Sequence, residues 1–98
     1  MRHDIIEIRS TGGGDPLAFE VTVREGSGET HHHVTMSRTT CERLTAGRHP
    51  PERCVEAAFW FLLDREPKES ILARFDVTVI SRYFPEFERE LPTYLSRS

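Results

Sequence analysis

Three consecutive histidines, His31 to His33, are the residues whose type and spacing could most directly do chemistry. Side chains two positions apart on a β-strand point to the same face, so His31 and His33 could bind one Zn²⁺ ion together. A zinc site needs three or four ligands, and the other candidates lie elsewhere in the chain: His3, Cys41 and His49. The competing interpretation is a polar strand face without a metal. Metal binding at His31 and His33 is therefore an alternative prediction.

Carboxylates and thiols offer two further kinds of chemistry, but neither forms a catalytic pattern. Paired carboxylates can act as general acid and base when one of them is desolvated. The acidic residues from Asp64 to Glu90 mostly have basic neighbours or helix-start positions, which is typical of solvated surfaces and caps. Nothing local marks Cys41 or Cys54 as an activated nucleophile. We predict no catalytic residues and expect a protein that is not an enzyme.

A pair of helices over residues 67–84, with a break at Phe75 and Asp76, would resemble a DNA-binding helix-turn-helix. Contact with phosphates needs a basic surface. From Asp64 to Ser98 the chain instead has seven acidic and six basic residues, and the expected reading helix, residues 77–83, offers only Arg82. The whole chain has a formal net charge of −3. Nucleic-acid binding is therefore disfavoured.

Four aromatic residues in the C-terminal half are candidates for a contact surface, since exposed aromatic side chains are favoured interface anchors. They are Trp60, Phe84, Phe87 and Tyr94. A small sheet also leaves an edge strand that can pair with an extended partner. The leading prediction is a non-enzymatic protein-interaction or regulatory module without a cofactor. Its partner would be another protein or a second copy in a homodimer.

The elements that must position these residues follow from hydrophobic periodicity. Alternating apolar residues predict three strands, at about residues 4–9, 17–24 and 29–36. Helical spacing and capping residues predict five helices, at about 38–46, 51–65, 67–75, 77–83 and 85–91. In the third of these, Ile71, Leu72 and Phe75 would form the apolar face. The fold class is α+β, with a small antiparallel sheet covered on one face by the C-terminal helices.

The connection between the second and third strands can be deduced from their apolar faces. Val21 and Val23 have odd numbers, whereas Val34 and Met36 have even numbers. Opposed residues in a hairpin share a face, so the loop must contain an even number of residues. The candidates are Gly26-Ser27 and Ser27-Gly28. Either choice places His32 toward the core and His31 and His33 on the outer face.

Length and composition indicate one small domain, since 98 residues can bury one core without disulfides. The longest apolar run, Ala57 to Leu63, is far shorter than a membrane span, so we expect no membrane partner. The opening residues lack the apolar stretch of a secretory signal. These features predict a cytoplasmic protein with reduced thiols.

Residues 61–88 read FLLDREPKESILARFDVTVISRYFPEFE. This stretch resembles the closing segment of a group of short, uncharacterised bacterial proteins. In that group an FLL-(D/E)-REP block is followed by SIL, a phenylalanine and a YFPE block. The resemblance implies a bacterial origin and an intact small domain, and it transfers no site residues.

Overall fold

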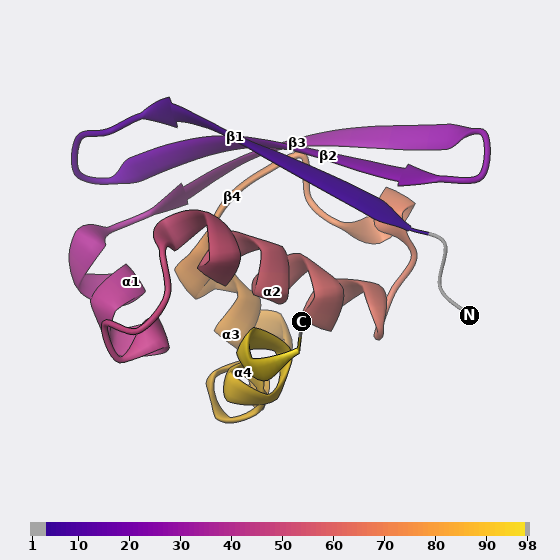
Figure 1. Cartoon of the computed structure of the whole chain (residues 1–98). Helices are drawn as coiled ribbons and strands as arrows, with labels where there is room; N and C mark the ends of the chain where they lie inside the picture. Colours follow the sequence, from indigo (N-terminus) through magenta and orange to yellow (C-terminus); the bar gives the residue numbers. More distant parts are fainter. Residues whose placement is uncertain (1–3, 98) are drawn as a thin grey trace.

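The computed structural model describes residues 4–97, which form a four-stranded sheet and a set of helices on one of its faces (Figure 1). The strand order is β1-β2-β3-β4. The predicted α+β class is confirmed. The bounds of the strands are β1 Ile5–Gly12, β2 Leu17–Glu25, β3 Gly28–Met36 and β4 Arg74–Asp76. The helices are α1 Arg38–Thr45, α2 Pro51–Leu63, α3 Ile80–Tyr83 and α4 Phe87–Ser96, with 3₁₀ turns η1 Lys68–Ser70 and η2 Val77–Val79.

The hairpin between β2 and β3 closes through Gly26 and Ser27, one of the two predicted loops. Gly26 has a positive φ of 59°, as the first central residue of a II′ turn requires. The resulting register pairs Val21 with His32 and places His32 in the interior, while His31 and His33 lie on the outer face. The alternation of odd and even positions along the two strands was thus sufficient to determine which histidine is buried.

The prediction of an antiparallel sheet is right for β1, β2 and β3 but wrong for the unpredicted strand β4, which pairs with β3 in parallel. The chain reaches β4 after crossing under the sheet through α1 and α2, so it returns in the same direction as β3. The predicted helix over residues 67–75 is also wrong. Only a 3₁₀ turn forms there, and Ile71 already has extended backbone angles.

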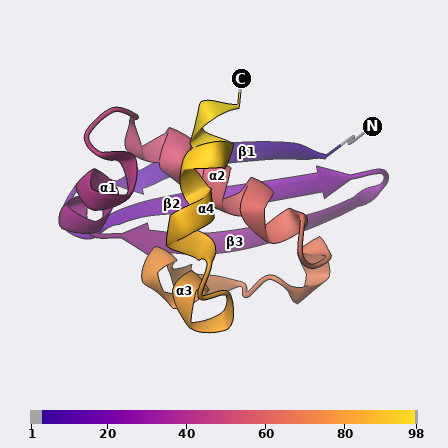
Figure 2. The same ribbon diagram turned by 90° about the horizontal axis from the view of Figure 1, so that it is seen from below.

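Helix α2 lies between the sheet and α4, so the structure has three layers (Figures 1 and 2). Phe59 points toward the sheet side, where its ring meets those of His32 and Phe75. Phe61, two residues later, packs against Phe87 of α4. Because successive helical residues are rotated by about 100°, two positions suffice to reach opposite faces. The broad apolar arc of the sequence therefore reflects burial on both sides.

Two further helix predictions need correction. Residues 77–83 form a 3₁₀ turn followed by only one turn of α-helix, α3. Helix α4 spans Phe87–Ser96 instead of the predicted 85–91, and it contains Pro92. Proline removes one intrahelical hydrogen bond, but burial of the last turn of α4 offsets that loss. The residues buried by that turn are Leu91, Tyr94 and Leu95.

Candidate binding pocket

The predicted metal ligands do not come together in the described part of the chain. His31 and His33 share the outer face of β3, where His31 donates to Glu29 at 2.8 Å and His33 donates to Glu20. Cys41 lies within α1, and His49 follows that helix in the loop before α2; both line a separate hollow at α1. His3 falls outside the described residues. Among residues 4–97, no group of three or more His, Cys, Asp or Glu side chains is arranged to hold a metal ion.

Both cysteines are free and buried. Burial raises the pKa of the Cys54 thiol to about 12 and also raises the pKa of Cys41. The thiolate is the nucleophilic form of cysteine, so both side chains are held in the unreactive form at neutral pH.

Two of the four predicted aromatic anchors are part of the core. Phe87 and Tyr94 expose only 1% and 6% of their surface and pack edge-to-face against Phe61. The Tyr94 hydroxyl donates to Asp64 at 2.6 Å. Trp60 is half-buried on α2, with its indole nitrogen 3.3 Å from Glu56. The expectation that all four aromatic residues lie on the surface is therefore wrong for Phe87 and Tyr94.

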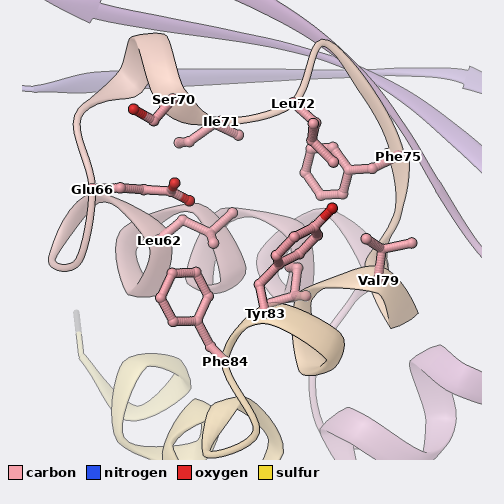
Figure 3. Close-up of a pocket in the computed structure, with 10 residues that line it drawn as sticks. Leu62, Glu66, Ser70, Ile71, Leu72, Phe75, Val79, Tyr83 and Phe84 are labelled. Atoms are coloured by element: carbon pink, nitrogen blue, oxygen red, sulfur yellow. The ribbon is translucent and has the colours of Figure 1, made fainter.

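The remaining aromatic candidate, Phe84, lines an open apolar pocket of about 290 Å³ (Figure 3). The pocket lies between the C-terminal end of α2, the segment that leads into β4, and α3. Leu72 and Tyr83 stand at its mouth and stay 45% and 67% exposed. The lining residues are Leu62, Glu66, Ser70, Ile71, Leu72, Phe75, Val79, Ile80, Tyr83 and Phe84.

Hydrogen bonds from the sheet hold the wall that carries Ile71 and Leu72. The buried His32 ring lies 2.7 Å from the Leu72 carbonyl through Nδ1 and 2.9 Å from the Thr30 hydroxyl through Nε2. A carbonyl can only accept, so Nδ1 carries the proton and Nε2 accepts from Thr30. Burial lowers the pKa of His32, which keeps the ring neutral. The wall of the pocket is thus anchored to β3 by a side chain.

The wall belongs to the segment of residues 68–76, and both ends of that segment are also held by side-chain contacts. Lys68 is 6% exposed, and its ammonium donates to Glu69 at 2.7 Å and to Glu25 at the tip of the β2–β3 hairpin at 3.3 Å. Asp76 accepts from the Thr35 hydroxyl and caps η2 through Thr78. Burial alone would raise the pKa of Asp76, but these hydrogen bonds outweigh it and lower the pKa. The pocket is therefore built from a well-anchored connection.

Glu66 is the acidic residue of the pocket, and its carboxylate points into the hollow (Figure 3). It is half-buried, and burial raises its pKa. Within residues 4–97 its carboxylate has no hydrogen-bond or ion-pair partner. The neighbouring Arg65 bonds instead to Glu86 and Glu90, each at 3.1 Å. A partly desolvated carboxylate without a partner in an apolar pocket is the arrangement expected of a binding site.

Sequence reasoning did not identify Glu66, Leu72 or Tyr83 as site residues. The sequence pattern predicts that Glu66 is one of several solvated carboxylates and that Leu72 lies on the apolar face of a helix, but that helix does not form. One signal was present: Pro67 follows Glu66 directly, and a residue before proline avoids helical geometry. That signal places Glu66 in a loop at the end of α2.

None of the helices described is long and apolar enough to cross a membrane. Comparison with known proteins adds no assignment to this geometry, because no protein-family model, curated protein or solved structure matches the chain.

Proposed function

We propose that this chain is a small, non-enzymatic protein-interaction module that holds an apolar side chain of a partner polypeptide in the pocket beside α3. A basic residue next to that apolar side chain would pair with Glu66. The observation that carries the proposal is the unpaired, half-buried Glu66 carboxylate at the wall of an open apolar pocket. The exposed Leu72 and Tyr83 side chains would then flank the bound segment.

The size of the pocket supports a side chain rather than a large cofactor. Its volume of about 290 Å³ lies just below the range for small-ligand sites, about 300–1,000 Å³. Burying one large apolar side chain contributes about 1.5–3 kcal/mol. Association also costs translational and rotational freedom. A single anchor therefore gives weak, reversible binding unless neighbouring residues of the partner add contacts.

The charge of Glu66 determines which residue of the partner should stand next to the apolar side chain that enters the pocket. A partly desolvated carboxylate gains most from a hydrogen-bonded cation and is repelled by a second carboxylate. The nearby cations are already engaged, since Arg65 and Lys68 each contact two carboxylates. A lysine or arginine of the partner would supply the missing charge.

A peptide array provides a direct test. Short synthetic peptides would vary one central residue among Leu, Phe, Ala and Ser, and its neighbour among Lys, Arg, Gln and Glu. We expect retention of peptides that combine Leu or Phe with Lys or Arg. The Glu66→Gln variant should lose the preference for the basic neighbour but keep the preference for the apolar residue.

Glu52→Gln is the matched control, because Glu52 is an exposed carboxylate at the start of α2 and does not line the pocket. This variant should bind the peptides as the unchanged protein does. Retention that depends neither on the apolar residue nor on the basic neighbour would contradict the proposal. So would a Glu66→Gln variant whose peptide preferences are unchanged.

A further inference from the structure

Strand β1 has a free edge. It pairs with β2 along one side only, and within residues 4–97 no other element runs along its outer side (Figure 2). The strand is eight residues long, and its first residue, Ile5, is 54% exposed. Edge strands present unpaired N–H and C=O groups that can pair with another chain.

The hairpin turn determines which groups of β1 point outward. Across the two-residue turn, Glu25 and Gly28 form a hydrogen-bonded pair, and such pairs alternate along antiparallel strands. The even residues of β2 therefore direct their N–H and C=O groups toward β1. Because Thr22 lies opposite Glu7, the odd residues of β1 complete these bonds.

The even residues of β1 must then direct their N–H and C=O groups to the free edge: Ile6, Ile8 and Ser10. The same alternation predicts that the odd residues of β3 point away from β2. The His33 N–H, which donates to the Ala73 carbonyl of the segment entering β4, agrees with this.

We propose that a second copy of this chain pairs with the free edge, β1 against β1 and antiparallel, about a two-fold axis through Ile8. In this register Ile8 lies opposite the partner's Ile8, and Ile6 lies opposite the partner's Ser10. All three outward-facing residues of each strand are then in hydrogen-bonded pairs. The two sheets join into one of eight strands.

Charge selects this register over its neighbours. Between the hydrogen-bonded pairs, Glu7 lies opposite the partner's Arg9, and the two-fold axis repeats that contact. An axis through Glu7 or through Arg9 would place identical charges opposite each other, which destabilises a strand pair. Within residues 4–97 Arg9 has no ion-pair partner, while Glu7 contacts Arg24 at 3.1 Å. The dimer would place a carboxylate of the partner opposite Arg9.

Helix α2 contributes a second surface on the same side. Leu62 faces the pocket next to α3, and Trp60, two residues earlier, points to the opposite flank of the helix. That flank faces β1, which α2 contacts. Pairing of the β1 edges would bring the α2 helices of the two copies toward each other beneath the joined sheet.

Charge reversal tests both the interface and its register. Glu7→Arg places two arginines opposite each other at each contact, and Arg9→Glu places two glutamates there. Each variant alone should dimerise about tenfold more weakly or worse. An equimolar mixture of the two variants restores opposite charges at both contacts, so it should form a heterodimer as stable as the unchanged dimer. Sedimentation velocity and native mass spectrometry report both species.

The exposed residue Glu52 provides the control, since Glu52→Arg should leave dimerisation unchanged. Restoration by mixing also shows that the single variants are folded. A monomeric unchanged protein at about 1 mM would overturn the proposal. A dimer insensitive to either reversal would do the same, as would a mixture that stays monomeric. Peptide binding to the pocket does not depend on these residues, so failure here is distinct from failure of the proposed function.

Discussion

Replacing His32 by leucine tests how the pocket wall is attached to the sheet. The change removes the hydrogen bonds to the Leu72 carbonyl and the Thr30 hydroxyl, which measure 2.7 and 2.9 Å. Leucine keeps an apolar contact with the Phe59 ring, so little cavity is created. Two hydrogen bonds are worth about 1–3 kcal/mol together, and a stranded buried partner adds about 1–3 kcal/mol. The two contributions add to an expected loss of about 2–6 kcal/mol in the free energy of unfolding.

Urea denaturation followed by circular dichroism at pH 7.5 would measure this loss, provided that the slope against urea is unchanged. Thr30→Val is the matched control, because it removes only the bond to Nε2 and leaves the bond to Leu72 in place. It should cost about 1 kcal/mol. If His32→Leu costs no more than the control, the anchoring role of His32 is refuted.

His32 should also make the free energy of unfolding depend on pH. Burial lowers the pKa of His32, although the hydrogen bond to Leu72 opposes the shift. The unfolded chain therefore binds a proton near pH 6.5, where the folded protein does not. Stability from this group is complete above about pH 6.5 and falls as the pH decreases below that value. The difference in stability between the unchanged protein and His32→Leu should shrink between pH 7.5 and 5; a constant difference would contradict this account.

Two further substitutions should stabilise the fold. Ala46→Gly should add about 0.5–1 kcal/mol, because Ala46 ends α1 with a positive φ of 54° that glycine adopts without strain; thermal unfolding would measure this, and a lowered midpoint would contradict it. Ser81→Ala should add about 1 kcal/mol, because the buried Ser81 hydroxyl has no hydrogen-bond partner among the described residues. Urea denaturation would check the second change, and a loss of stability would show that the hydroxyl does have a partner.

Local patterns were sufficient to predict most of the framework. The alternation of Phe19, Val21 and Val23 determined the buried face of β2, and the even number of Val34 limited the hairpin loop to two candidates, one of which forms. Helical spacing of apolar residues also predicted α2, which begins at Pro51 as expected. Each of these features depends on residues close in sequence, where spacing alone determines which side chains share a face.

Strand β4 could not be predicted in this way, because its stability comes from a distant partner. Arg74 to Asp76 pair with His33 to Thr35, about forty residues earlier. The spacing of Ile71, Leu72 and Phe75 fits a helix equally well, and a three-residue strand has too few positions to show alternation. Pairing with β3 and the His32 bond to Leu72 favour the extended chain.

The pocket exists because the segment that leads into β4 is extended instead of helical. A helix over residues 67–75 would have turned Ile71, Leu72 and Phe75 inward together. The extended segment instead spreads these side chains around a hollow that α3 closes only on one side. Glu66 has no partner among the described residues because Arg65 already forms ion pairs with Glu90 in α4 and with Glu86, the residue just before α4. Which carboxylate stays unpaired is a property of the assembled fold, so no local pattern shows it.

The strand order places the two proposed surfaces at opposite edges of the sheet. The pocket lies beside β4 and α3, whereas the free edge belongs to β1 (Figure 2). Pairing through β1 therefore leaves both pockets of a dimer open, at the two ends of the joined sheet. A single apolar anchor binds weakly, but two linked anchors that span the dimer would gain from the high effective concentration of the second site. Under this arrangement Glu7→Arg should weaken capture of a two-anchor partner while leaving single peptides unaffected.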